Sequence, residues 1–336
     1  MEWVRGKTIG HGSFATISLA QLTTHNSDIP PLMAVKSCGV SHSASLIYER
    51  RILAELNDCP EIIHCFGESI TVENRIKMYN IALEYASGGD LAYNLKNYGN
   101  FQLSEVRRYT NSILKGLQFI HRNGFVHCDI KLQNILLVSD GVNADVKIAD
   151  FGLAKKTDGE SKSNYEIRGT PMYMAPETVV SDEQEPPSDI WALGCLVAEM
   201  VTGKPAWFCS DIGPLLLKIG VGTEVPEIPG KLSTAGKDFL GKCFLKDPRK
   251  RWTAEMLLNH PFVAKEKAED CIRSFSPRDH FNFPDWELTE SFAMTQLPSP
   301  ELSHLAPLVS PATRLRQLTV NERPSWSDSS RWVTVR

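Results

Sequence analysis

Several features that mark other classes of protein are missing from this chain of 336 residues. It has no excess of basic residues, since it contains 36 Lys and Arg residues and 40 Asp and Glu residues. The formal net charge of −4 therefore disfavours a nucleic acid partner held by charge. Its eight cysteines form no CxxC pair, and a chain of this length does not need the disulfides of small secreted scaffolds. We expect reduced thiols in a cytoplasmic protein, with a nuclear location left open.

Signals for secretion and for membrane insertion are also missing. The first ten residues, MEWVRGKTIG, contain no apolar region of the kind that a signal peptide carries. The most apolar long stretch, from Ile190 to Val201, contains Glu199 and is too short to span a bilayer. It therefore predicts a buried helix, and we expect no membrane association. The sequence also shows no internal repeat and no EF-hand spacing.

The N-terminal part of the chain has the pattern of a sheet. Residues 3 to about 90 alternate short apolar runs with turn residues, which predicts strands. One helix interrupts them from about Ser43 to Leu56, with Ser43 or Ser45 as its N-cap.

The pattern changes to longer helices after Gly88. One helix can be capped by Ser104 and ends at Asn123, and another runs from Ser188 or Asp189 to Thr202. From residue 264 to residue 336 the chain is rich in Ser and Pro and has no periodicity, which predicts a largely disordered tail.

Residues 9–17 read IGHGSFATI, a glycine-rich turn between two predicted strands. Gly10 and Gly12 would let backbone N–H groups approach phosphate oxygens closely. Taken alone, an ordinary hairpin turn explains the pattern equally well.

Lys36 lies on an apolar predicted strand and needs a partner, because an isolated buried ammonium is costly. Glu49, on the helix that follows, is the candidate. The pair could hold an anionic ligand over the glycine-rich turn. The alternative is a lysine that reaches solvent from an edge strand.

Residues 127–134, HCDIKLQN, carry the most specific pattern. A match to H-x-D-x-K-x-x-N is expected by chance in about one chain in five hundred. Asp129 can accept the proton of a hydroxyl, and Lys131 can neutralise a phosphoryl group. Asn134 and Asp150 supply hard oxygen ligands suited to Mg²⁺. The pattern therefore predicts phosphoryl transfer.

With these motifs in order, residues 3 to about 263 resemble a eukaryotic protein kinase. The resemblance implies an α+β, bilobal fold within a kinase domain of residues 1–263. A small antiparallel-sheet N-lobe with one main helix would span about residues 1–84, and a mostly helical C-lobe about residues 87–263. The flexible tail of residues 264–336 would follow. ATP and Mg²⁺ are the implied cofactors.

The resemblance also assigns roles to single residues. Asp129 and Lys131 match the catalytic residues, and Asn134 and Asp150 the metal ligands. The implied ATP site consists of Ile9, Gly10, Gly12, Ile17, Ala34, Lys36, Glu49, Leu83, Glu84, Ala86, Asp90 and Leu136. Among these, Leu83 matches the gatekeeper and Asp90 the ribose contact, while residues 84–86 match the hinge that binds adenine.

Substrate class follows from two matches to Ser/Thr kinases rather than tyrosine kinases. Lys131 stands two residues after Asp129, and Thr170 in GTPMYMAPE matches the threonine that contacts the catalytic loop.

Arg251 matches the arginine that pairs with the glutamate of the APE motif, here Glu177. Loss of Arg251 is expected to damage folding more than chemistry.

The strings GTPMYMAPE, WALGCLVAEMVTGKPAW and DPRKRWTAEMLLNHPF resemble the MEKK class of MAP kinase kinase kinases. The tail string SPRDHFNFPDWE resembles the short plant members of that class. The implied function is phosphorylation of the activation segment of a MAP kinase kinase in a stress or hormone cascade. A Ser/Thr kinase of another branch, such as an MST-like kinase, is the alternative. A pseudokinase scaffold is a further one.

Three residues of the chain depart from the family pattern. Ala15 replaces the third glycine of the phosphate loop and Ile17 replaces the usual valine, and both changes are mild. Cys128 replaces an arginine that holds a phosphorylated residue of the activation segment in the family. We therefore hypothesise that activity depends less on such phosphorylation. The alternative is that Cys128 is a small buried residue without regulatory meaning.

Candidate phosphorylation sites lie in two segments. Ser161 and Ser163 fall in the activation segment, with Lys155, Lys156 or Arg168 as alternative cationic partners. Three Ser-Pro sites for proline-directed kinases fall in the tail, at Ser276, Ser299 and Ser310.

The tail also contains a string, from Phe281 to Pro284, that resembles a docking motif for MAP kinases. A downstream MAP kinase is therefore an expected partner of the tail. The preferred alternative is that Phe281, Phe283 and Trp286 pack back on the kinase domain.

Overall fold

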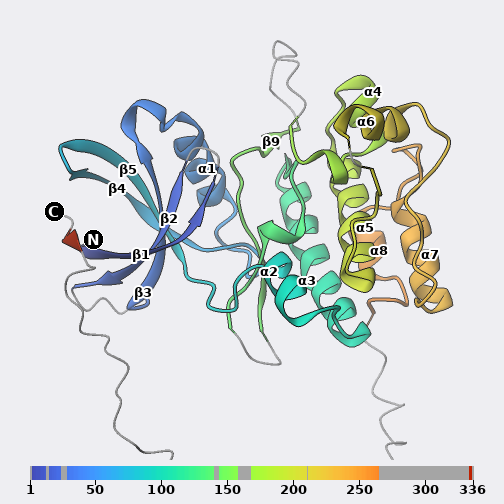
Figure 1. Ribbon diagram of the computed structural model, residues 1–336, viewed down its shortest axis with the longest axis horizontal. Coiled ribbons are helices and arrows are strands. Elements are labelled where there is room, and N and C mark those ends of the chain that lie inside the picture. Colours follow the sequence, from blue (N-terminus) through green and yellow to red (C-terminus); the bar gives the residue numbers. More distant parts are fainter. Residues whose placement is uncertain are drawn as a thin grey trace, which may run out of the picture. The chain divides into compact units, whose positions relative to one another are not determined.

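The computed structural model describes residues 2–12, 15–23, 29–139, 144–157, 168–209 and 211–264, and the backbone of residues 333–334. These residues belong to one compact unit. Its N-terminal part is an antiparallel sheet with one long helix, and its C-terminal part is mostly helical (Figure 1). The expected α+β, bilobal fold is confirmed.

Six strands form the N-terminal sheet, in the order β10-β1-β2-β3-β5-β4. The strands are β1 (Trp3–His11), β2 (Thr16–Leu22), β3 (Leu32–Gly39), β4 (Cys65–Glu73), β5 (Ile76–Glu84) and β10 (Val333–Thr334). The apolar runs VRGKTIG, FATISLAQL, LMAVKSC and MYNIALEY predict β1, β2, β3 and β5 but not β4. Strand β4 lies at the sheet edge, where Ile70 and Val72 are exposed, so its apolar residues do not mark a buried face.

Helix α1 (Ala44–Glu55) contacts β4 and β5 and buries Leu46, Glu49 and Leu53. Ser43 stands at the predicted N-cap position, but its hydroxyl donates to the carbonyl of Val40 and caps no N–H group of the helix. A short 3₁₀ helix, η1 (Val40–His42), precedes α1 and supplies this local acceptor.

The C-terminal part is built on helices joined by short strands. The helices are α2 (Leu91–Tyr98), α3 (Leu103–Arg122), α4 (Pro176–Ser181), α5 (Pro186–Thr202), α6 (Ile212–Gly220), α7 (Thr234–Cys243) and α8 (Ala254–Leu258). Strand β6 (Phe125–Val126) pairs with β9 (Lys155–Lys156), and β7 (Ile135–Leu137) with β8 (Val146–Ile148). The 3₁₀ helices η2 (Leu132–Asn134) and η3 (Pro171–Tyr173) lie in the connecting loops.

The starts of two helices differ from the predictions. Helix α3 is capped by Gln102 and not by Ser104, because Gln102 and Glu105 form a reciprocal capping box. Helix α5 begins at Pro186, before Ser188, since proline suits the first turn of a helix. Its predicted end is confirmed, with Gly203 in the left-handed conformation.

Helix α5 is buried almost all round at the centre of the main hydrophobic core. In the part of the chain that is described, no helix is both long and apolar enough to cross a membrane.

Backbone hydrogen bonds join the sheet to the helical part. The N–H of Ile63 donates to the carbonyl of Ile148 at 3.0 Å, and the N–H of Ile148 donates to Glu61 at 2.8 Å. On the other side, the N–H of Gly88 donates to Leu137 at 2.9 Å. Strands β7 and β8 are thereby fixed to the segments that follow α1 and β5. This arrangement brings the loop after β8, which contains Asp150, to the sheet.

Candidate active site

The loop that carries Asp129 is fixed by Asp189 of helix α5. The Asp189 carboxylate accepts hydrogen bonds from the N–H groups of His127 at 2.9 Å and Cys128 at 3.0 Å. It also lies 2.9 Å from Nε2 of His121. Burial raises the pKa of Asp189, but the hydrogen bonds and charges of His121 and His127 together outweigh burial and hold that pKa below its usual value. Cys128 has a φ of 65°, a strained conformation that these bonds stabilise.

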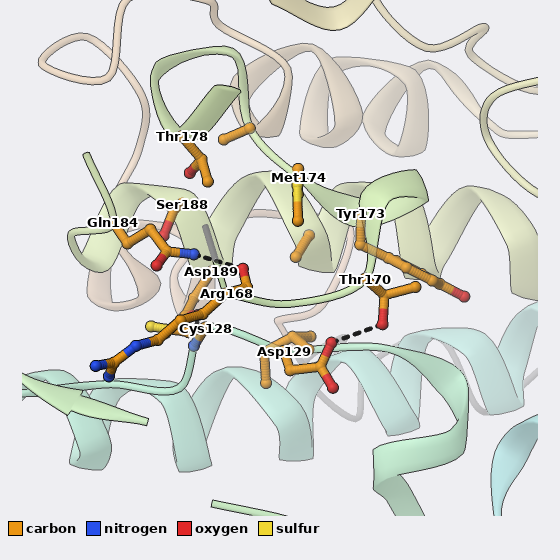
Figure 2. A pocket seen from close by; sticks show the side chains of 13 residues that line it. Cys128, Asp129, Arg168, Thr170, Tyr173, Met174, Thr178, Gln184, Ser188 and Asp189 are labelled. Carbon is orange, nitrogen blue, oxygen red and sulfur yellow. Dashed lines mark hydrogen bonds between the residues drawn. The ribbon is translucent and has the colours of Figure 1, made fainter. Parts of the chain in front are cut away.

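Asp129 is the centre of a group of hydrogen-bonded side chains and is 7% exposed. Lys131 Nζ lies 2.7 Å from its Oδ2, and Thr170 Oγ1 donates to its Oδ1 at 2.8 Å, as Figure 2 shows for Thr170. Lys131 also donates to Thr170 Oγ1 at 3.0 Å. Asn134 Nδ2 donates to the Asp129 carbonyl at 2.8 Å and to Oδ2 at 3.1 Å. A carboxylate held in this way can orient a hydroxyl and accept its proton.

Lys36 joins the sheet to the helical part. Its Nζ lies 2.7 Å from Glu49 Oε2 on α1 and 2.9 Å from Asp150 Oδ1. Burial lowers the pKa of Lys36, but the two carboxylates outweigh burial and raise it, so the ammonium stays charged. A fixed buried cation of this kind can bind the phosphates of a nucleotide.

Two side chains beside this group offer oxygen atoms to a metal ion. The side chain of Asp150 is 49% exposed, whereas Asn134 uses its amide nitrogen on Asp129 and keeps Oδ1 without a partner among the described residues. These hard oxygens suit Mg²⁺, which also takes water and phosphate oxygens as ligands. Within the described ranges, no three His, Cys, Asp or Glu side chains form a metal site by themselves. The residues therefore fit an ion shared between protein and phosphate.

The predicted nucleotide-binding residues come from neighbouring strands. Ile9 is on β1 and 39% exposed, while Gly10 of the same strand is paired with Ile17 on β2. Ile17 is in turn paired with Lys36, and Ala34 of β3 is paired with Leu83 of β5.

At the turn between β1 and β2, the N–H of Gly12 donates to the carbonyl of Ala15 at 2.8 Å. Leu136 of β7 forms a bridge with Asp90. Apolar side chains on two sides and backbone groups at the turn are what a purine nucleotide requires.

A model of the protein kinase domain matches residues 3–263. The chain belongs to the protein kinase family. A protein of Arabidopsis thaliana named mitogen-activated protein kinase kinase kinase 20 is 49% identical to it over 100% of both chains. Another from the same plant, mitogen-activated protein kinase kinase kinase 18, is 43% identical over 80% of this chain and 79% of its own length.

A yeast relative extends the similarity beyond plants. The serine/threonine-protein kinase BCK1/SLK1/SSP31 of Saccharomyces cerevisiae is 35% identical over 77% of this chain and 18% of its own length. The chain is a Ser/Thr protein kinase, and the predicted resemblance to plant kinases of the MEKK class is confirmed.

Two carboxylates that the sequence assigns to the nucleotide site of this kinase are engaged by protein groups. Glu84 Oε2 lies 2.9 Å from Lys147 Nζ of β8 and accepts the N–H of His64 at 3.3 Å. Asp90 caps α2, because its Oδ1 accepts the N–H of Tyr93 at 2.8 Å. The predicted contacts of Glu84 and of the half-buried Ala86 with adenine would therefore use backbone groups. The predicted contact of Asp90 with ribose would use its second carboxylate oxygen.

The predicted pairing of Arg251 with Glu177 is present. The guanidinium donates to both carboxylate oxygens, at 2.6 and 3.0 Å, and its side chain has no exposed surface. It also donates to the carbonyls of Pro187 and Leu245 at 2.8 and 2.9 Å. The pair connects α4, after the activation segment, to the start of α5 and to the C-terminal part of the domain.

Five candidate phosphorylation sites and the tail motif lie outside the described residues. They are Ser161, Ser163, Ser276, Ser299, Ser310 and residues 281–284.

Sequence reasoning missed three side chains that shape the site. They are Lys147, His121 and Gln184, each of which contacts a group distant along the chain. The only signal that could have found His121 is the charge of Asp189, because a buried carboxylate needs a partner. For Lys147 and Gln184 the sequence carries no local signal.

Proposed function

We propose that this Ser/Thr kinase is a MAP kinase kinase kinase. It would transfer the γ-phosphoryl group of ATP to Ser or Thr in the activation segment of a MAP kinase kinase, within a stress or hormone cascade. The observation that supports this most strongly is the 49% identity over the whole chain to a plant protein of that name. The intact set of Lys36, Asp129, Asn134 and Asp150 argues against a scaffold without activity.

The chemistry rests on positions and charges. Asp129, held by Asn134 and Thr170, orients the substrate hydroxyl and accepts its proton. Lys131, 2.7 Å from Asp129, supplies positive charge where the phosphoryl group passes. Lys36 holds ATP phosphates from the sheet side. Mg²⁺, held by Asn134 and Asp150 together with the phosphates, would neutralise developing charge.

The test is a panel of purified MAP kinase kinases made inactive by substitution, incubated with ATP and Mg²⁺ and the full chain. We expect phosphate on the activation segment of at least one member, located by mass spectrometry. Asp150→Asn serves as the inactive control. Phosphorylation of a generic protein but of no MAP kinase kinase would contradict the proposal and favour another kinase branch. No transfer to any protein would favour a scaffold.

The tail extends the proposal to a second partner. Three Ser-Pro sites and the string FNFP, at residues 281–284, support an interaction with a downstream MAP kinase. We expect that Phe281→Ala together with Phe283→Ala weakens capture of such a kinase from a purified mixture. Equal capture by both chains would contradict this part of the proposal.

A further inference from the structure

The end of the activation segment sits directly on the loop that carries Asp129. Gly169 has a φ of 106°, and a Cβ atom there would lie 2.4 Å from the carbonyl oxygen of Cys128. Only glycine allows this approach. One residue further on, Thr170 makes its hydrogen bonds to Asp129 and Lys131. The position of residues 168–170 therefore decides whether Thr170 meets the catalytic carboxylate.

Gln184 holds this segment from the opposite side. Its Nε2 donates to the carbonyl of Arg168 at 2.6 Å, and the residue is 6% exposed. The dashed line in Figure 2 joins this amide to Arg168, and Cys128 and Ser188 line the same small cavity. Gln184 lies just before α5, the helix whose Asp189 binds the backbone of Cys128. A single stretch of chain, residues 184–189, thus holds both the segment and the catalytic loop.

One cation near this contact is paired with a carboxylate of the protein. Lys155 of β9 lies 3.3 Å from Glu185, the residue after Gln184. Cys128 adds no positive charge, and burial raises the pKa of its thiol, so the thiol stays neutral. The nearby Lys155 is therefore paired with a carboxylate of the chain without any added phosphate.

We propose that Gln184 is a positioning residue for phosphoryl transfer. Its amide fixes residues 168–170 on the catalytic loop and so keeps Thr170 on Asp129 without a phosphate on the activation segment. The bond is partly buried and joins two residues that are 16 positions apart in the chain. Loss of the donor removes this hydrogen bond to the carbonyl of Arg168, which favours displacement of the segment.

The experiment compares four forms of the full chain after phosphatase treatment, with the absence of phosphate checked by mass spectrometry. Gln184→Met keeps the length of the side chain and removes the donor, whereas Gln184→Lys keeps a donor. Gln21→Met makes the same exchange at an exposed glutamine and serves as the control. The substrate is casein, so the result does not depend on whether a MAP kinase kinase is the natural substrate.

We expect wild-type enzyme to keep its rate within about threefold after phosphatase treatment. Gln184→Met should lower kcat about ten- to hundredfold, with the KM for ATP and the melting temperature unchanged. Gln184→Lys should regain most of kcat, and Gln21→Met should match wild type. This division between kcat and KM separates positioning from general damage to the fold.

Three results would overturn the proposal. The first is a wild-type kcat for Gln184→Met. The second is a loss of kcat in Gln184→Met that accompanies a lower melting temperature and is equally large in Gln184→Lys. Failure of both variants to fold counts as the same result. The third is a hundredfold loss of wild-type rate after phosphatase treatment, which would show that a phosphate holds the segment.

Discussion

Two buried cations of this kinase, Lys36 and Arg251, are held by carboxylates in opposite ways. Arg251 has no exposed side-chain surface, and Glu177 and backbone carbonyls take up its donors. Lys36 lies between Glu49 and Asp150, and the second of these carboxylates is half exposed. A pair whose hydrogen bonds are all made inside the protein leaves no group for a ligand. A pair that opens toward solvent can exchange a partner for a ligand.

The largest expected effect is on activity, at Lys36. Lys36→Met should lower turnover about a thousandfold or more, because the cation that faces the phosphates is lost. Stability should fall less than in the Arg251 variant, since Glu49 can take up a proton. Kinase assays and thermal melting measure the two effects. Lys77→Met, at an exposed position on β5, is the control and should behave as wild type. Turnover of Lys36→Met above a tenth of the wild-type value would show that phosphoryl transfer does not require Lys36.

The second effect is on stability, at Arg251. Arg251→Ala leaves the carboxylate of Glu177 buried without a partner and should lower the free energy of unfolding by about 3 to 5 kcal/mol. Urea denaturation measures this loss, with the exposed Arg249→Ala as control. The rate per folded molecule should remain close to wild type. An unchanged urea midpoint for Arg251→Ala would contradict the structural role of Arg251. A loss of kinase rate with an unchanged urea midpoint would also contradict it.

A third ion pair is intermediate in the exposure of its side chains. Glu84 and Lys147 are 19% and 13% exposed in their side chains and join the β5 end to β8. Glu84→Gln should raise the KM for ATP about three- to tenfold with little change in kcat, because a partly exposed pair contributes about 1 kcal/mol.

The matched control for this pair is an exchange of charges. The double variant Glu84→Lys with Lys147→Glu should recover the KM, whereas each single change should raise it. Equal values in single and double variants would mean that the pair does not set the nucleotide site.

The smallest effect is on the pH dependence of stability, through Asp189. Its pKa in the folded protein lies below the ordinary value of 3.8, so the unfolded chain binds more protons in this range. Its contribution is therefore complete above about pH 5 and is lost as the pH falls toward its lowered pKa. Urea midpoints between pH 5.5 and pH 3.5 should fall less steeply for Asp189→Asn than for wild type. Parallel slopes would contradict the assignment, and the exposed Asp58→Asn is the control.

The sequence by itself determined that Asp129, Lys131 and Asn134 lie close together, because they fall within six residues of one loop. Helix ends set by local groups were predicted where glycine acts, as at Gly203, and failed where a reciprocal side-chain pair competes, as at Gln102 and Glu105. The pairing of Arg251 with Glu177 was predicted only through resemblance, since nothing local links residues 74 positions apart.

Only the tertiary structure decided which distant groups meet. Lys36 and Asp150 are 114 positions apart, and Gln184 reaches Arg168 across a loop and a helix. Sequence patterns report which face of an element is apolar, because burial of apolar surface drives folding. They do not report which polar group finds a buried carbonyl or carboxylate, since that choice depends on how packed elements place a few atoms within hydrogen-bonding distance.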